Sequence, residues 1–412
     1  MPSMRAAAIL VALFLLWDPA TTVVAQGPAR IVAIGDIHGE IDGFKRILTA
    51  AGLADAAGRW TGGRTQLVQT GDYTDRGDGT RAVLDLLMAL EPQARKAGGR
   101  AHILLGNHEV MNLIGDTRDA TREIFATFAD AQSEKRREQA WQDYAALAAA
   151  KAAKGEAVPA VYAQTREAWL TTHPPGYVEY RDAFAPRGVY GRWLRTKDII
   201  HVLDGTIFMH AGIAPGVAPD RLDDLNGRVR QEIQKLDRFV ERLIDLKLAT
   251  RTFTLQEIVQ VAAHEVSAAN NLMTAAKEAG KEPDRRKLNV PLLLEAQEIL
   301  TIDKWAVVAP DGPLWYRGLA TEPEGTNGDP FSPLLAKYGA KRFVTGHTIP
   351  ATRRITARFG GRVVLIDTGM LAVAYQGRPA ALEIAGDTLT AIYEDGRVPL
   401  GVGVPVPGHG LP

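Results

Sequence analysis

Short apolar runs that end in polar, glycine-containing turns begin the ordered pattern of this chain. Runs at residues 30–35, 65–70 and 101–106 have the length and composition of buried strands. Helical stretches follow the first two runs, at residues 41–51 and 79–96. This alternation predicts consecutive β-α-β units with a parallel sheet. Because ligands bind at the carboxyl ends of strands in such sheets, the polar loops after these runs are the expected place for chemistry.

Two blocks interrupt the strand pattern and read as helical insertions. The first covers about residues 116–182 and is rich in Ala, Glu, Lys and Arg. The second covers about residues 227–302, where apolar residues recur at three- and four-residue steps, as in an amphipathic helix. Neither block carries a cluster of metal-ligating residues. A role as scaffold or lid and a role in admitting substrate both remain open.

The strand pattern returns outside these blocks, which favours an α/β fold in one domain from residue 30 to residue 398. The further strands are expected at residues 199–203, 206–210, 341–346, 362–367, 380–384 and 388–393. The last two resemble a hairpin that turns at Gly386-Asp387. From Pro399 to the end, alternating Gly and Pro predict a flexible tail at residues 399–412.

The first 25 residues have the pattern of a secretory signal peptide. Arg5 precedes an apolar run at residues 6–17, and Val23 to Ala25 offer small residues for cleavage before Gln26. This run is shorter than the roughly 20 residues that span a bilayer. We therefore favour a cleaved signal, cut after Ala25, over an uncleaved membrane anchor, and expect a secreted, periplasmic protein without a stable membrane span.

The amino-acid composition restricts the kinds of partner and of reaction that are expected. Hydrophobic residues make up 46% and charged residues 23%, as in ordinary soluble enzymes, and the net charge is zero. A neutral chain gives no reason to expect nucleic acid or a membrane surface as partner. The chain has no cysteine, which excludes a phosphocysteine intermediate and thiolate metal ligands.

Five loops place Asp, Asn or His directly after an apolar run and beside glycine. They read GDIHG at 35–39, GDYTDRG at 71–77, GNHE at 106–109, MHAGI at 209–213 and GHT at 346–348. Any one of them alone is more often a turn than a site. Their occurrence together, each at the end of a predicted strand, points to one functional centre.

The donor atoms of these loops predict two metal ions per chain. Asp36 and His38 can both reach one ion, and Asp72 can bridge two ions through its two oxygens. Asn107, His210 and His347 can complete the second site. The predicted metal ligands are therefore Asp36, His38, Asp72, Asn107, His210 and His347. Oxygen and imidazole donors suit divalent or trivalent Mn, Fe, Zn or Mg, among which we favour manganese. Such a pair can bind phosphate and ionise water.

Three further residues fit phosphate ester hydrolysis. His108 follows Asn107 directly and is the predicted general acid for the leaving oxygen. Asp75 is placed to orient that imidazole, and Arg76 offers a planar fork for two phosphate oxygens. The remaining histidines, at positions 102, 173, 201, 264 and 409, have no motif around them and are expected to be structural or without a role.

Together, the five motifs resemble the PPP-type metallophosphatases of the calcineurin-like phosphoesterase superfamily. The arginine of GDYTDRG separates this group from related phosphodiesterases. Within the group, GNHEVMNLIGD at 106–116 and Asp367-Thr368-Gly369 are similar to the bacterial Shewanella-like protein phosphatases. The chain lacks the SAPNYC stretch of the eukaryotic Ser/Thr enzymes.

The resemblance implies a β-sandwich flanked by helices, two metals and direct attack by a metal-bridging hydroxide. It assigns the same six ligands, the acid pair His108 and Asp75, and phosphate contacts from Arg76 and Asn107. It also implies a second phosphate-binding arginine, for which Arg317 is the candidate; a surface turn anchored by Trp315 is the rival interpretation. Asp367 to Gly369 fit either a wall of the site or a strand-end turn.

The predicted function is hydrolysis of phosphomonoesters, with phosphorylated Tyr, Ser or Thr of proteins as the favoured substrates. A dinucleoside polyphosphate or nucleotide hydrolase of the same superfamily is the alternative enzyme. A non-catalytic binding module is the alternative outside enzymes, but such a protein is expected to have lost ligands or His108, and none is missing here.

Overall fold

The computed structural model describes residues 30–401, apart from residues 154–158, 285–287 and 326–328. The predicted signal peptide at residues 1–25 and His409 lie outside the described residues. Within the described residues the strands are β1 Ile31–Ile34, β2 Gln66–Gln69, β3 Arg100–Ile103, β4 Ile200–Leu203, β5 Thr206–Met209, β6 Arg342–Thr345, β7 Thr356–Arg358, β8 Val363–Leu365, β9 Ala380–Ala385, β10 Thr388–Tyr393 and β11 Gly396–Pro399.

These strands form two mixed sheets. One has the order β11-β10-β9-β1-β2-β3 and the other the order β4-β5-β6-β8-β7. Three neighbouring strands are parallel in each sheet: β1, β2 and β3 in the first, and β5, β6 and β8 in the second. The hairpin predicted at residues 380–393 is present as the antiparallel pair β9–β10.

The two sheets pack face to face as a sandwich, and successive side chains of each strand point alternately into this interface and away from it. In β1, Ile31 and Ala33 point into a core shared with Phe208 of β5 and Val344 of β6. Val32 and its neighbour Ile34 instead face the larger core beneath the helices. Because successive side chains of a strand point to opposite faces, a strand buried on both sides needs an unbroken apolar run, which is what β1 has. The predicted helix-flanked β-sandwich is confirmed.

Two helices cover the outer face of the first sheet, and the others belong mostly to the two helical blocks. The α-helices of the described residues are α1 Ile41–Ala50, α2 Thr80–Lys96, α3 Asn107–Ile114, α4 Arg122–Phe128, α5 Ser133–Ala152, α6 Arg166–Thr172, α7 Tyr177–Phe184, α8 Val189–Leu194, α9 Leu222–Asp245, α10 Leu255–Glu278, α11 Val290–Ile299, α12 Gly318–Thr321, α13 Ser332–Lys337 and α14 Ala372–Tyr375. Short 3₁₀ turns lie between several of them.

Both helical blocks are larger than predicted. The first continues past Asp182 through α8, which packs so closely on α7 that a Cβ at Gly191 would lie 2.0 Å from the carbonyl oxygen of Ala185. Two glycines in so short a segment concealed this helix in the sequence. The second block starts at Leu222, where α9 begins with Asp223 and Asp224 in its first turn.

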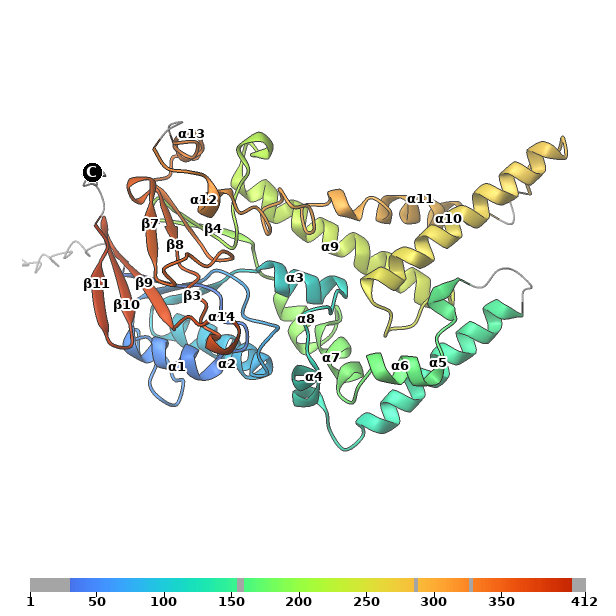
Figure 1. The fold of residues 1–412 in the computed structure, drawn as a ribbon, viewed down its shortest axis with the longest axis horizontal. Coiled ribbons are helices and arrows are strands. Elements are labelled where there is room, and N and C mark those ends of the chain that lie inside the picture. Colours follow the sequence, from blue (N-terminus) through green and yellow to red (C-terminus); the bar gives the residue numbers. More distant parts are fainter. Residues whose placement is uncertain (1–29, 154–158, 285–287, 326–328, 402–412) are drawn as a thin grey trace, which may run out of the picture.

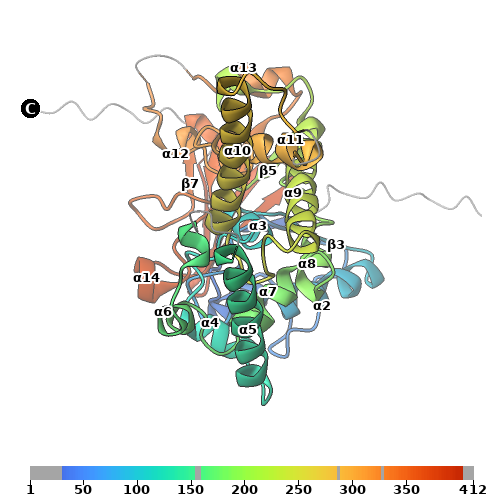
Figure 2. The same ribbon diagram turned by 90° about the vertical axis from the view of Figure 1, so that its right-hand side faces the viewer.

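The two blocks extend together from one side of the sandwich. Figure 1 shows the sheets on the left and the helical blocks reaching to the right, and in Figure 2 α10 and α5 point toward the viewer, one above the other. The hydroxyl of Tyr162 in the first block donates to the carbonyl of Leu248 in the second over 2.6 Å. The Phe253 ring packs 6.2 Å from that of Tyr144, centroid to centroid. The insertions therefore contact each other.

The sheets differ from the prediction at β3, at two edge strands and in the tail. β3 ends at Ile103 because the chain then leaves the sheet, and the Leu105 N–H donates to the carbonyl of Asp198 instead. β7 and β11 were missed, since both are short edge strands without an apolar run. Of the tail predicted from Pro399, that residue ends β11 and Leu400 still donates to Leu389, while residues 402–412 lie outside the described residues.

No described helix is both long and apolar enough to span a bilayer.

A buried carboxylate fixes the loops that leave the first sheet. Glu109, in the first turn of α3, is 0% exposed. Its Oε2 accepts the N–H groups of Gly106 and Asp72, both over 2.8 Å. Its Oε1 accepts the N–H groups of Tyr73 and Thr74 and the Thr74 hydroxyl. One side chain thus joins the loop after β2 to the start of α3.

We predict that Glu109→Gln lowers the free energy of unfolding by about 3 kcal/mol, because an amide NH₂ would then face the two N–H groups that now donate to Oε2. Urea denaturation at a fixed metal concentration measures this change. The control Glu40→Gln alters a half-buried side chain that accepts the Gly43 N–H, and it should cost less than about 1 kcal/mol. Equal effects of the two variants would contradict the account of Glu109.

Candidate metal centre and active site

The carboxyl ends of the parallel strands from both sheets meet at one edge of the sandwich. The loops after β1, β2 and β3 bring Asp36, His38, Asp72 and Asn107 to this edge, and those after β5, β6 and β8 bring His210, His347 and Asp367. A cavity of about 490 Å³ opens here. It is lined by Asp36, His38, Asp72, Arg76, Asn107, His108, Arg118, Asp119, Trp315, Arg317, His347, Thr348, Ile349, Asp367 and Tyr375.

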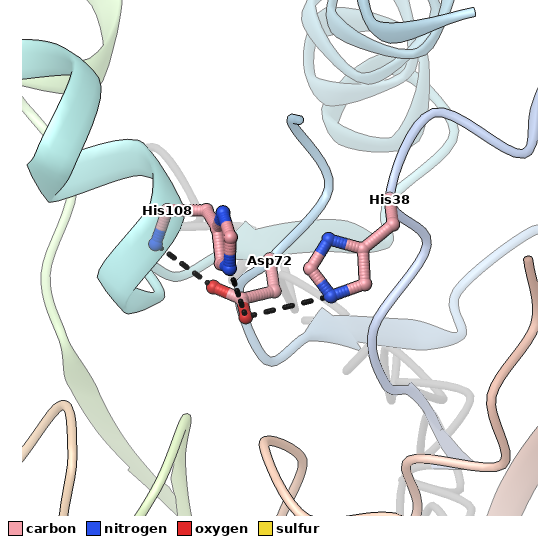
Figure 3. Close-up of side chains that lie close together, drawn as sticks. All are labelled: His38, Asp72 and His108. Atoms are coloured by element: carbon pink, nitrogen blue, oxygen red, sulfur yellow. Dashed lines mark hydrogen bonds and ion pairs between the residues drawn. The ribbon is translucent and has the colours of Figure 1, made fainter. Parts of the chain in front are cut away.

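Asp72 lies at the centre of the predicted ligands. Its Oδ2 is 3.7 Å from Nε2 of His38, 3.8 Å from Nε2 of His108 and 3.2 Å from Nε2 of His210. Figure 3 shows the imidazoles of His38 and His108 on either side of this carboxylate, with His108 projecting from the start of α3. Burial lowers the pKa of His38 to about 3, so its imidazole is neutral and able to bind a metal.

Asp36 and His347 join the two sheets across the site. Both carboxylate oxygens of Asp36 accept the N–H of His347, at 3.0 and 3.2 Å. The approach requires glycine at position 346, where a Cβ would lie 2.1 Å from Oδ1 of Asp36. Gly106 has the same role toward Asp72, since its Cβ would lie 2.1 Å from Oδ1 of that residue. The glycines of GHT and GNHE thus make room for carboxylates.

The second group of predicted ligands is also in mutual contact. Nε2 of His210 lies 2.9 Å from Oδ1 of Asn107 and 3.0 Å from Nδ1 of His347. His210 is fully buried beneath the cavity, and its Nδ1 lies 3.1 Å from the carbonyl of Thr70. Burial, reinforced by His210, lowers the pKa of His347 to about 2, which leaves that imidazole neutral.

His108 and Asp75 form a buried pair beside this cluster. Nδ1 of His108 lies 2.9 Å from Oδ2 of Asp75, and the two residues are each 1% exposed. Nε2 of His108 therefore remains directed toward Asp72. Burial alone would lower the pKa of His108, but the charge of Asp72 and the hydrogen bond to Asp75 raise it to about 9. The imidazole is consequently protonated at neutral pH and can donate a proton.

Arg76 reaches into the cavity from the same loop as Asp72. Its Nη1 lies 3.2 Å from Nε2 of His38 and contacts the hydroxyl of Tyr375 in α14. Its backbone N–H donates to the carbonyl of Asp119 over 3.2 Å. The guanidinium is thus placed at the wall of the cavity, beside the predicted metal ligands.

Arg317 and Asp367 both line the cavity. Nη1 of Arg317 donates to the carbonyl of His347 over 2.7 Å and to the Thr348 hydroxyl over 3.0 Å. Trp315 also anchors the turn, through Nε1 to the Val307 carbonyl at 3.0 Å. Burial raises the pKa of Asp367 to about 6. The pKa of Asp36 is also raised, by burial and by the charges of Asp367 and Asp72.

Sequence reasoning missed several residues of the site. Arg118 and Asp119, from the first helical block, and Tyr375 line the cavity, whereas no described residue of the second block does. Glu109 stood inside the GNHE motif, so a search for partners of its carboxylate would have found it. The other three stand in no motif and only the fold brings them to the site.

Backbone strain is concentrated in this centre. Among the described residues, ten other than glycine have positive φ, and five of them are His38, Asp72, Asp75, Arg76 and His347, with φ between 47° and 69°. Such conformations are unfavourable for residues with a Cβ and persist only where surrounding contacts enforce them. The carboxylate of Glu109 supplies such contacts around Asp72.

The donor set fits metal ions. In the described residues, two groups each place three ligand atoms within 4.8 Å of one another: His38, Asp72 and His108, and Asp72, His210 and His347. Both groups share Asp72, as expected of a bridging carboxylate. Geometry alone also admits His108 as a ligand, although its other ring nitrogen is held by Asp75. Oxygen and neutral imidazole donors without sulfur match divalent ions such as Mn, Fe, Zn or Mg.

The other described histidines lie away from the cavity. His102 of β3 stacks on His201 of β4 with ring centroids 4.0 Å apart, at the junction of the two sheets. His173 stacks on Trp169 at 3.9 Å inside the first helical block. His264 lies on α10.

Comparison with known proteins agrees with this geometry. The sequence pattern of the calcineurin-like phosphoesterase family matches residues 29–266, more than half of the chain. An uncharacterised protein of Schizosaccharomyces pombe is 29% identical over 370 residues, which cover 89% of this chain and 80% of that protein. Shewanella-like protein phosphatase 2 of Arabidopsis thaliana is 44% identical over 108 residues, but these cover only 26% of this chain and 28% of that one.

A solved structure shares the fold over most of the chain. The crystal structure of a cold-active protein-tyrosine phosphatase of a psychrophilic Shewanella species aligns with a TM-score of 0.56 at 22% identity, covering 91% of this chain and 81% of that one. The resemblance found in the five motifs is therefore confirmed by sequence and by fold. The chain belongs to the calcineurin-like phosphoesterase family.

Proposed function

We propose that this calcineurin-like phosphoesterase is a phosphomonoester hydrolase whose substrates are phosphorylated Tyr, Ser or Thr side chains of proteins. The observation that carries the proposal is the placement of His108, paired with Asp75, and of Arg76 around Asp72 in one cavity. A monoester needs both a proton for its leaving oxygen and a cation for its terminal oxygens. In this proposal, residues 30–398 form one domain that carries the activity.

Two metal ions per chain, for which manganese is our first candidate, would be held by the six predicted ligands, with Asp72 between them. When bound, they supply positive charge to phosphate oxygens and lower the pKa of a water molecule. The neutral state of His38 and His347 and the raised pKa of Asp36 support this proposal, because buried carboxylates of like charge need cations to remain ionised.

The residues of the chain then bind the phosphate and move the proton. Arg76 offers two parallel N–H donors to phosphate oxygens, and Asn107 and Arg317, which line the same cavity, add further donors. His108 gives the proton on Nε2 to the leaving oxygen as the bond to phosphorus breaks. Asp75 keeps the proton on Nδ1 and so fixes which nitrogen donates.

The walls of the cavity support a phosphoprotein substrate. Trp315, Ile349 and Tyr375 offer apolar surface beside the phosphate-binding residues, which suits the side chain that carries the phosphate. Two proteins similar to this chain are named as protein phosphatases, the Arabidopsis relative and the Shewanella tyrosine phosphatase. The neutral net charge supports no role in binding nucleic acid.

We also propose that the protein is exported to the periplasm and loses residues 1–25. This proposal is supported by the apolar run at residues 6–17, which has Arg5 before it and small residues to Ala25 after it.

Hydrolysis should depend on metal. Protein lacking residues 1–25 should hydrolyse p-nitrophenyl phosphate with added Mn²⁺ and lose this activity in excess chelator, since the ions supply the charge that the reaction needs. Phosphotyrosine, phosphoserine and phosphothreonine peptides should be hydrolysed faster than nucleotides. Full activity in chelator would rule out the metal mechanism, and faster hydrolysis of nucleotides would favour the alternative substrate class.

Removal of the proposed acid should separate catalysis from metal binding. His108→Asn should lower kcat for phosphate monoesters by about 100-fold, the usual contribution of a general acid. Metal content, measured by mass spectrometry, should be unchanged. His102→Asn is the control, because His102 lies in β3 away from the cavity. Loss of a metal ion from the His108 variant would show that this residue is a ligand instead.

A further inference from the structure

A tyrosine of the first helical insertion contacts Asp75, the partner of His108, without lining the cavity. Tyr180 on α7 is 0% exposed. Its ring packs among aromatic side chains of the insertion, with centroids 5.1 Å from Phe125, 5.0 Å from Phe128 and 4.6 Å from Phe184. Its hydroxyl, however, contacts α3 and the loop after β2, outside this aromatic cluster.

The contacts of this hydroxyl form a continuous path to His108. The Tyr180 hydroxyl donates to Oδ1 of Asn112 in a short hydrogen bond and lies 3.2 Å from Oδ1 of Asp75. Nδ2 of Asn112 donates to the same Asp75 oxygen and to the carbonyl of His108, both over 2.9 Å. The other oxygen of Asp75 holds Nδ1 of His108 at 2.9 Å.

All four residues of this path are closed off from solvent. Tyr180, Asn112, Asp75 and His108 are between 0% and 3% exposed. Water therefore cannot easily replace a lost donor, and each polar atom depends on its neighbours in the path. Burial also raises the pKa of Tyr180 well above its ordinary value, so the hydroxyl keeps its proton.

We propose that Tyr180 is a positioning residue for the general acid, through which the first helical insertion becomes part of the active site. The proposal rests on the role of His108 as general acid given above. Tyr180 does not touch the cavity, and it acts by holding the carboxylate of Asp75.

Asp75 needs this support for two reasons. Its backbone lies in the left-handed region with φ of 66°, so its position depends on contacts rather than on local preference. Its Oδ1 is held by Asn112 and Tyr180 while Oδ2 holds His108. Without the tyrosine hydroxyl, Oδ1 of Asn112 loses its donor, and Oδ1 of Asp75 is held by Asn112 alone.

A neighbouring tyrosine provides a matched control. Tyr177 lies on the same helix, is 2% exposed and donates its hydroxyl to the carbonyl of Thr252 over 3.0 Å. Tyr177→Phe removes this hydrogen bond, and the one that the hydroxyl accepts from Arg181 over 3.3 Å, without touching the path to His108. It therefore reports what the loss of such a bond does to stability alone.

The experiment compares Tyr180→Phe, Tyr177→Phe, His108→Asn and the double variant Tyr180→Phe/His108→Asn, all loaded with Mn²⁺ and assayed for metal content and thermal unfolding. The readout is kcat/KM on a series of aryl phosphates whose leaving groups range from acidic to weakly acidic phenols. A weakly acidic leaving group depends most on the general acid. Tyr180→Phe should lose about 10-fold on the poorest leaving group, the range expected for a hydrogen bond to a charged group, and much less on the best.

Two comparisons decide the outcome. Tyr177→Phe should show no dependence on the leaving group, and Tyr180→Phe should cause no further loss in the His108→Asn background, because both changes act on one unit. A uniform loss for Tyr180→Phe, or full additivity with His108→Asn, would overturn the proposal. If Tyr180→Phe does not fold, Asn112→Ala breaks the same path from α3 and is judged by the same criteria.

The series also separates this inference from the proposed function. If His108→Asn lowers kcat/KM equally for every leaving group, His108 is not the general acid and the proposed mechanism fails. If His108→Asn shows the dependence and Tyr180→Phe behaves like Tyr177→Phe, only the inference about Tyr180 fails.

Discussion

The gathering of carboxylates in one buried place is the constraint that organises this protein. Asp36, Asp72 and Asp367 line a single cavity and are each 4% exposed or less. Burial and mutual repulsion raise the pKa of Asp36, and burial raises that of Asp367. Like charges in a poorly solvated site are costly unless cations are bound between them. The neutral imidazoles of His38 and His347 lie beside these carboxylates, so the arrangement is suited to metal ions.

The fold supplies the means of bringing these charges together. Parallel strands of two separate sheets end at the same edge of the sandwich, so loops far apart in the sequence deliver their side chains to one point. Residues with a Cβ then adopt left-handed conformations at five positions of the site. Glu109 and the close approaches at Gly106 and Gly346 hold these loops in place. The surrounding contacts thus offset the unfavourable backbone conformations of the site residues.

Much of this could be predicted from the sequence, because the signals were local. An apolar run with glycine and a polar donor after it marks a strand end, and each of the six predicted ligands follows such a strand end. The edge strands β7 and β11 gave no apolar run, and the glycines of α8 concealed that helix. Tyr180 could not be predicted at all. It lies 105 residues from Asp75 in the chain, and the two residues meet only because the fold places the Tyr180 hydroxyl against Asp75 and Asn112.

The helical blocks differ in their relation to the centre. The first contributes Arg118 and Asp119 to the cavity and Tyr180 to the path behind His108, whereas the second packs against α3 through α9. α3 therefore carries Asn107 and His108 at one end while both insertions support it. Substrate preference and the position of the acid are both expected to depend on the first block.

The number and place of bound ions test the central claim most directly. Elemental analysis of Mn²⁺-loaded protein, together with anomalous diffraction from its crystals, should find two ions per chain, roughly 3.5–4 Å apart and bridged by Asp72. A single ion, or ions bound away from Asp72, would contradict the account.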